Sequence, residues 1–291
     1  MHQSGFVNII GRPNVGKSTL MNALVGEKLS IITPKAQTTR HRIFGILNGE
    51  DFQIVFSDSP GIIIKPVSGL HEAMMKTVES SFKDGDIIML ITEPGEPIQQ
   101  LEEALNKIKS LEIPKYLVLN KIDKLKKEEL LPLLKHWDDQ KIFDHVFPVS
   151  ALKKRNTDEL LRQILKDLPE NPAWYPKDQL TDRPERFFVS EIIREKIFIH
   201  YKQEIPYSCE IVTEAFEEEE KIIRIHSIIY TERESQKNII IGKKGSGIKR
   251  IGTEARKDME RFFEKKIYLE LFVKVKEKWR DNPNQLRQFG Y

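Results

Sequence analysis

The sequence predicts an α/β domain with a mostly parallel sheet and helices on both faces, followed by a smaller α+β domain. Strand-like and helix-like segments alternate over residues 4 to about 170, which is typical of a sheet covered on both faces. Prolines then interrupt regular structure between residues 169 and 184, as in an extended linker. We therefore expect a first domain at 1–170, a linker at 171–188 and a second domain at 189–291.

The order of apolar segments gives the expected elements of both domains. In the first, the expected strands are 6–10, 42–47, 52–57, 87–92, 116–120 and 145–149, and the expected helices are 18–25, 70–82, 96–110, 127–137 and 157–168. The second begins with a helix at 189–201 and strands at 209–216 and 221–231, followed by a short helix and a glycine loop. A long helix with an apolar stripe from Ile248 to Phe262 and an alternating strand from Ile267 to Val275 complete it. Both patterns are typical of a buried core.

The composition is that of a globular protein with room for two cores. The chain has 291 residues, of which 39% are hydrophobic and 31% charged. The single cysteine, Cys209, excludes a disulfide within the chain and fits a reducing compartment. The chain shows no basic-then-apolar leader and no apolar run near the ~20 residues that cross a bilayer. We expect a cytosolic protein that is at most peripheral on a membrane.

A phosphate-binding loop is predicted at residues 11–18. The stretch matches GxxxxGK[ST], follows an apolar strand and precedes a helical pattern. Its glycines let backbone N–H groups point at phosphate oxygens, and the helix start adds the positive end of a dipole. Lys17 is expected to reach the β- and γ-phosphates, and the Ser18 hydroxyl to ligate Mg²⁺. The expected nucleotide contacts here are Gly11, Arg12, Pro13, Asn14, Val15, Gly16, Lys17, Ser18 and Thr19.

A second motif, Asn120-Lys121-Ile122-Asp123, predicts which base the bound nucleotide carries. The Asp123 carboxylate would accept hydrogen bonds from N1–H and the N2 amino group of guanine. Adenine has no matching donors, so the discrimination is large. Asn120 would brace the loops, and the Lys121 stem would cover the base. After the next strand come Ser150, Ala151 and Leu152, of which the first two would offer backbone groups to the guanine O6 edge.

Two further loops are expected to sense the γ-phosphate. Asp58-Ser59-Pro60-Gly61 ends a strand; Asp58 would hold Mg²⁺ through water, and the Gly61 N–H would face the γ-phosphate. The polar loop 37–41 carries a threonine that would close on Mg²⁺ only with three phosphates present. The expected metal ligands are Ser18, Thr39 and Asp58, and the expected catalytic set is Lys17, Thr39, Asp58 and Gly61.

All five sequence elements of the translation-factor-type GTPases are present in order along the chain, and the chain therefore resembles that class. The chain departs from Ras-like members at Ile62, which stands where they carry a water-orienting glutamine. The resemblance therefore implies a branch whose members are slow alone and often use potassium, and Asn14 matches the loop asparagine associated with K⁺ there. Ser59 replaces the usual threonine, which is a mild change.

The second domain has a basic GxxG loop. From Lys237 to Arg280 there are fourteen basic and six acidic residues, whereas 210–220 holds six acidic and no basic ones, so an anionic partner is expected for this part. A KH domain uses GxxG to clamp single-stranded RNA, and the element order predicts the type II form. The expected RNA contacts are Gly242, Lys243, Lys244, Gly245, Lys249 and Arg250.

The joined domains resemble the bacterial Era family over essentially the whole chain, including residues 37–42, Gln-Thr-Thr-Arg-His-Arg. The resemblance implies a monomeric GTP/GDP switch that binds the 3′ end of the small-subunit ribosomal RNA and assists 30S maturation, with peripheral inner-membrane contact. A rival interpretation is a nucleotide-gated RNA-binding scaffold with incidental turnover. A third, a nucleotide kinase or ATPase, is disfavoured by Asp123.

Overall fold

The computed structural model describes residues 1–291 and divides into two compact units, each with its own core. The first comprises Met1–Val67 and His71–Asp182, and the second comprises Ser68–Leu70 and Arg183–Tyr291.

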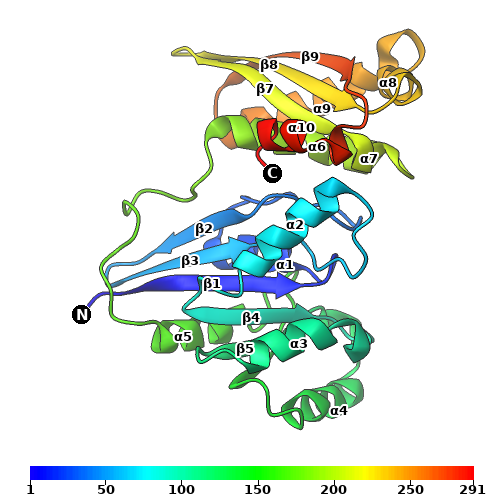
Figure 1. Cartoon of the computed structure of the whole chain (residues 1–291). Helices are drawn as coiled ribbons and strands as arrows, with labels where there is room; N and C mark the ends of the chain where they lie inside the picture. The colour runs from blue at the N-terminus through cyan, green and yellow to red at the C-terminus, as the bar shows by residue number, and fades with distance from the viewer. The chain divides into compact units, whose positions relative to one another are not determined.

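The first unit is built on a six-stranded sheet in the order β2-β3-β1-β4-β5-β6 (Figure 1). Only the β2–β3 pair is antiparallel; the other neighbours are parallel. The central strand β4 is buried along its whole length, as expected of a parallel strand covered on both faces. The strands confirm the predicted mostly parallel sheet. They are β1 (Gln3–Gly11), β2 (Ile43–Asn48), β3 (Phe52–Asp58), β4 (Ile87–Thr92), β5 (Lys115–Leu119) and β6 (His145–Pro148).

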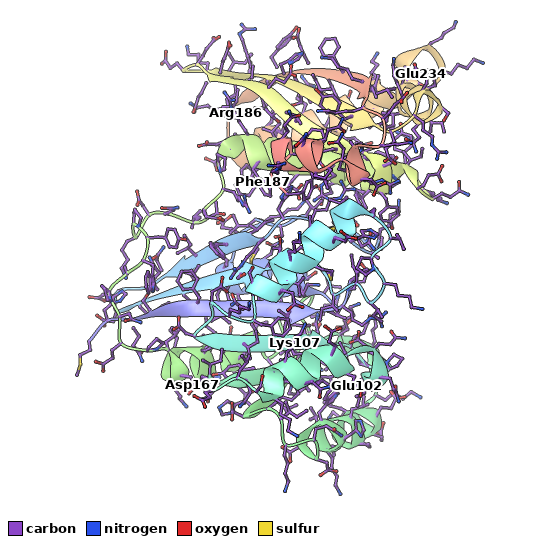
Figure 2. The ribbon with its side chains drawn as sticks, in the orientation of Figure 1. Glu102, Lys107, Asp167, Arg186, Phe187 and Glu234 are labelled. Carbon is purple, nitrogen blue, oxygen red and sulfur yellow. The ribbon has the colours of Figure 1, made fainter.

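Five α-helices cover the two faces of this sheet (Figure 1). Side chains of α2, α3 and α4 share one core with strand residues such as Ile10 and Leu90, and α1 packs on the other face together with α5. Exposed charges also join the outer helices, because Lys107 of α3, which is labelled in Figure 2, pairs with Glu79 of α2. The helices are α1 (Lys17–Val25), α2 (Gly69–Ser80), α3 (Glu102–Lys109), α4 (Lys127–Asp138) and α5 (Thr157–Asp167).

The helix expected at 96–110 begins later than predicted. Pro97 is extended, with ψ 123°, and a short 3₁₀ turn, η1 (Ile98–Gln100), precedes α3. An extended residue cannot belong to the helix, so the regular hydrogen bonding starts only after this turn. A second 3₁₀ turn, η2 (Ile122–Lys124), follows β5.

Residues 171–182, expected as part of a linker, belong to the first unit and lie against its sheet, and we call them the strap. The Gln53 side chain accepts the N–H groups of Trp174 and Tyr175 at 2.7 and 2.9 Å. The N–H of Ile46 on β2 donates to the Leu180 carbonyl at 2.8 Å. The structure thus differs from the composition-based expectation, because backbone groups make most of these contacts and leave no sequence pattern.

The second unit is a three-stranded sheet in the order β7-β8-β9, in which β7–β8 is antiparallel and β8–β9 parallel. Its apolar core includes Ile193 of α6, Ile240 of α8, Ile251 of α9 and Ile229 of β8. The alternation of β9 is confirmed, since alternate residues from Ile267 onward join this core. The elements are α6 (Glu185–His200), α7 (Ile205–Ser208), β7 (Glu210–Glu218), β8 (Ile222–Thr231), α8 (Glu234–Ile241), η3 (Lys243–Gly245), α9 (Ser246–Phe263), β9 (Lys266–Val275), η4 (Trp279–Asp281) and α10 (Pro283–Gln288).

The helix α6 begins four residues before the expected start, because Pro184 occupies the position just before its first turn, where proline is well tolerated. The short α7, between α6 and β7, and the short α10, after β9, were not expected from the sequence. None of the helices combines the length and the apolar character needed to cross a membrane.

Candidate functional site

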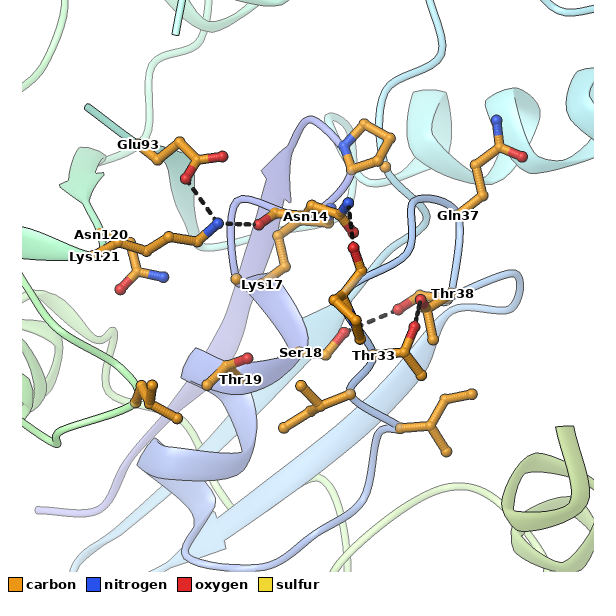
Figure 3. A pocket seen from close by; sticks show the side chains of 18 of the residues that line it. Asn14, Lys17, Ser18, Thr19, Thr33, Gln37, Thr38, Glu93, Asn120 and Lys121 are labelled. Carbon is orange, nitrogen blue, oxygen red and sulfur yellow. Dashed lines mark hydrogen bonds and ion pairs between the residues drawn. The ribbon is translucent and has the colours of Figure 1, made fainter. Parts of the chain in front are cut away.

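A cavity of about 570 Å³ opens in the first unit, beside the phosphate loop and the loop after β5 (Figure 3). Twelve of the predicted contact residues line it: Pro13, Asn14, Gly16, Lys17, Ser18, Thr19, Thr39, Gly61, Asn120, Lys121, Asp123 and Leu152. The other predicted residues of this site do not line it: Gly11, Arg12, Val15, Asp58, Ser59, Pro60, Ser150 and Ala151. Several of these support residues that do, as their contacts below indicate.

The two glycines of the phosphate loop are required by close approaches. Gly11 has φ +151°, and a Cβ there would lie 2.4 Å from the Ile91 carbonyl oxygen. Gly16 has φ +99°, and its Cβ would lie 2.2 Å from Nδ2 of Asn120. Both the backbone conformation and the space therefore exclude a side chain, and the loop after β5 can pack directly on the phosphate loop.

Lys17 is buried at the base of the loop with neutral partners. Its Nζ donates to the carbonyls of Gly11 and Arg12 at 3.2 and 3.0 Å. Burial lowers the pKa of Lys17 to about 8, against the opposing influence of the Asp58 and Glu96 carboxylates. An ammonium held in this way gains from an anion placed in the cavity.

Three oxygen-bearing side chains meet beside Lys17. The Ser18 hydroxyl donates to Oδ2 of Asp58 at 2.6 Å and lies 2.9 Å from Oγ1 of Thr39. Burial raises the pKa of Asp58, although Lys17 and these hydroxyls oppose the shift. The second carboxylate oxygen, Oδ1, is buried and has no hydrogen-bond partner. The arrangement brings together the three expected metal ligands.

The loop after β5 holds its predicted base-recognition side chain in place. Ser150 donates to Oδ1 of Asp123 at 2.5 Å, which fixes an otherwise exposed carboxylate. Asn120 donates to the Val15 carbonyl at 2.8 Å and so ties this loop to the phosphate loop. Its Oδ1 accepts the N–H of Ala151 at 3.0 Å. The Ala151 amide, expected to face guanine O6, therefore has a partner within the protein.

The segment after β3 is fixed by backbone contacts. The Ser59 hydroxyl donates to the Ile9 carbonyl at 2.9 Å. A Cβ on Gly61 would lie 2.6 Å from the Pro13 backbone nitrogen, so Gly61 can lie directly against the phosphate loop. Ile62 donates its N–H to the Gly11 carbonyl at 3.0 Å, and its side chain packs against the core shared by α2, α3 and α4.

Sequence reasoning missed part of the cavity wall. The additional lining residues are Ile31, Ile32, Thr33, Pro34, Gln37, Thr38, Glu93 and Lys124. Asn14 donates to the Pro34 carbonyl at 3.1 Å, and the hydroxyls of Thr33 and Thr38 lie 2.8 Å apart. The sequence predicted the polar loop at 37–41 as part of this site, but it did not predict the preceding residues 31–34, which lie between α1 and that loop. The signal available was the lack of regular structure from Gly26 to the next strand.

The GxxG loop of the second unit is a tight turn between α8 and α9. Gly242 and Gly245 have φ +72° and +76°, and Lys244 between them has φ +52°. The side chains of Lys243 and Lys244 are exposed, as are those of Lys249 and Arg250 in the first turns of α9. All six predicted RNA contacts thus lie on one loop and the helix start that follows it.

Fold and site together define a P-loop GTPase joined to a C-terminal KH domain. The family model described as 50S ribosome-binding GTPase matches residues 6–121, and the KH domain model matches residues 204–280. The chain belongs to the GTPase Era family. It is 48% identical to GTPase Era of Syntrophus aciditrophicus, over 100% of this chain and 96% of that protein. It is 45% identical to GTPase Era of Clostridium kluyveri, over the full length of both.

Two solved structures extend the similarity to three dimensions. One is a crystal structure of Era in complex with MgGDPNP and nucleotides 1506–1542 of 16S ribosomal RNA, with a TM-score of 0.95 and 39% identity over 100% of this chain and 99% of that one. The other is an Aquifex aeolicus Era variant bound to GDP·AlF₄⁻, also with a TM-score of 0.95 and 39% identity, over 99% of each chain.

Proposed function

We propose that this GTPase uses its nucleotide state to control binding of the 3′ end of the small-subunit ribosomal RNA during assembly of the 30S subunit. The observation that carries the nucleotide half is the meeting of Lys17, Ser18 and Asp123 at one cavity. The RNA half is supported by the exposed basic GxxG loop and by the 16S RNA in the complex of the similar Era structure. By resemblance to the family, it acts as a monomer in the cytoplasm, with peripheral contact to the inner membrane.

The side chains at the cavity fit a magnesium ion. Ser18, Thr39 and Asp58 supply the hard oxygen ligands that Mg²⁺ prefers, and Asp58 has a buried oxygen without a partner. The MgGDPNP in the similar Era structure supports the same ion. When bound, Mg²⁺ supplies neutralisation of the phosphate charge.

In this proposal the site residues divide the work on GTP. Lys17 binds the β- and γ-phosphates with its buried ammonium, and Gly61 offers its N–H to the γ-phosphate. Asp123 accepts from the guanine base, and the Lys121 stem covers it. The Ile62 side chain is committed to the core and cannot orient water, so another group must do so. A potassium ion bound with the help of Asn14 is our candidate for accelerating the reaction.

The packing of Ile62 also favours a second candidate function. A chain without a water-orienting side chain could serve as a nucleotide-gated RNA-binding scaffold whose GTP turnover is incidental. In that case the affinity for RNA would differ between the GTP and GDP states, but RNA would not change the rate of hydrolysis.

Multiple-turnover phosphate release separates the two candidates. We expect the protein to release phosphate from GTP and not from ATP, and to do so faster with an RNA oligonucleotide of the small-subunit 3′ end than with one of scrambled sequence. The Asp123→Asn variant should bind GTP more weakly and xanthosine triphosphate more tightly, because an amide can donate to the 2-keto oxygen. Hydrolysis of ATP at the rate of GTP would contradict the base assignment, and a rate unaffected by the RNA would favour the scaffold.

A further inference from the structure

The turn after β4 has a geometry that the sequence sets in advance. Pro94 and Gly95 occupy its two central positions, and Gly95 has φ +82°. The Glu96 N–H donates to the Glu93 carbonyl at 3.2 Å. Proline second, a positive-φ glycine third and this closing bond are the features of a type II β-turn. The turn therefore holds two carboxylates, Glu93 and Glu96, close together at its ends.

Glu93 contacts the base-recognition loop. Its Oε2 lies 2.7 Å from Nζ of Lys121, which also donates to the Asn14 carbonyl at 2.5 Å (Figure 3). The Lys121 ammonium is thus fixed between a carboxylate of the turn and the backbone of the phosphate loop. The aliphatic part of the Lys121 side chain, which is expected to cover the guanine base, is therefore held in place through its Nζ.

Glu96 contacts the phosphate loop. Its carboxylate is almost fully buried, with 3% of the side chain exposed, and lies 3.6 Å from Nη1 of Arg12. Thr92 donates to the other oxygen at 2.5 Å. Arg12 is the residue whose carbonyl accepts from Lys17, so Glu96 acts on the part of the loop that positions the phosphate-facing lysine.

We propose that the Glu93–Glu96 turn is a clamp that holds the phosphate loop and the base-recognition loop in register, with Glu93 and Glu96 as positioning residues for the bound guanine nucleotide. Neither carboxylate needs to touch the nucleotide. Each acts through a cation of one nucleotide-binding loop, Lys121 or Arg12, and the rigid turn makes the two loops depend on each other. The inference rests on the proposed nucleotide function and adds residues to it.

The test measures how fast fluorescently labelled GDP dissociates from the full-length protein. Glu93→Gln and Glu96→Gln keep the side-chain size but remove the charge. We expect Glu93→Gln to speed dissociation roughly two- to fivefold, as for a partly exposed ion pair, and Glu96→Gln roughly tenfold, because its carboxylate is buried. The matched control is Glu103→Gln on α3, which breaks an exposed pair with Lys107 and should leave dissociation unchanged.

The decisive measurement is a double-mutant cycle. If Glu96 acts through Arg12, then Glu96→Gln should have little further effect in an Arg12→Gln background. A merely structural role would give the same fold-change in both backgrounds, which would overturn the clamp. So would wild-type dissociation rates in Glu93→Gln and Glu96→Gln proteins that hold labelled GDP and melt like the wild type. A wild-type chain that does not bind labelled GDP would overturn the proposed function itself, and the clamp with it.

Discussion

At the scale of single residues, Lys17 sits buried beneath the phosphate loop with two backbone carbonyls as its hydrogen-bond partners. Burial lowers its pKa from 10.5 to about 8, so the folded chain without nucleotide holds this proton less tightly than the unfolded chain does. The charged form therefore opposes folding below about pH 8, and this opposition fades as the pH rises toward 10.5. An anion bound in the cavity would offset this free-energy cost of the buried ammonium.

Replacing Lys17 by Met should stabilise the nucleotide-free protein. At pH 7 we expect a gain of at most about 3 to 4 kcal/mol, at roughly 1.4 kcal/mol for each pKa unit, and the loss of the two hydrogen bonds to carbonyls reduces it. The gain should shrink between about pH 8 and pH 10.5, where the wild-type lysine loses its proton in the folded state. Thermal unfolding of both proteins without nucleotide, at pH 7 and pH 10, measures this. A variant that is less stable than the wild type at pH 7 would contradict the argument.

At the scale of elements, two loops meet over the cavity. Asn14 of the phosphate loop donates to the Pro34 carbonyl of the loop that precedes β2, and Thr33 and Thr38 join within that loop. A monovalent site between these loops would be lined by backbone carbonyls and the Asn14 amide oxygen. We propose the space between these two loops as the place where a potassium ion would bind.

Exchanging sodium for potassium should accelerate GTP hydrolysis by the wild type. Asn14→Ala should erase the difference between the two salts, because it removes the side chain that ties the loops together. Phosphate release in matched KCl and NaCl buffers is the measurement. Equal rates in both salts for the wild type would leave Asn14 as a structural tie and refute its role in potassium binding.

Motifs with a fixed spacing were predictable at this scale, and contacts between unrelated segments were not. The glycine spacing of residues 11–18 and the apolar run before Asn120 locate both loops, because each depends on local chain conformation. The pairing of Glu93 with Lys121 depends instead on how two loops are brought together by the sheet. Pro94-Gly95 is a sequence typical of a β-turn, but nothing in it indicates which side chains the turn contacts. Ile31 and Ile32 were missed for the same reason.

At the scale of the whole molecule, the chain carries two binding surfaces on two units with separate cores. The division predicts that a change in one surface leaves the other ligand's affinity intact. Lys243→Asp with Lys244→Asp reverses two exposed charges and keeps both glycines of the GxxG loop. Lys126→Asp with Lys127→Asp, at an exposed pair where α4 begins, is a control with the same change in net charge.

The Lys243/Lys244 double variant should bind single-stranded RNA of the small-subunit 3′ end more weakly, by well over ~1 kcal/mol. The slope of log affinity against log salt concentration should become shallower by about 1.4, which is the value for two lost phosphate contacts on a single strand. GTP affinity should not change in either variant. RNA titrations at several salt concentrations provide the measurement, and wild-type affinity in a folded Lys243/Lys244 variant would reduce the GxxG to a simple turn.

The strap also covers the edge strand of the first unit's sheet. β2 is an edge strand, and an open edge is a template for pairing with another chain. The N–H groups of Phe44 and Ile46 are instead occupied by the Asp182 side chain and the Leu180 carbonyl, at 3.0 and 2.8 Å. A nucleotide-binding fragment cut at residue 170 would leave these donors exposed and become prone to edge-to-edge aggregation. A fragment cut after Asp182 carries its own cover and should stay in solution.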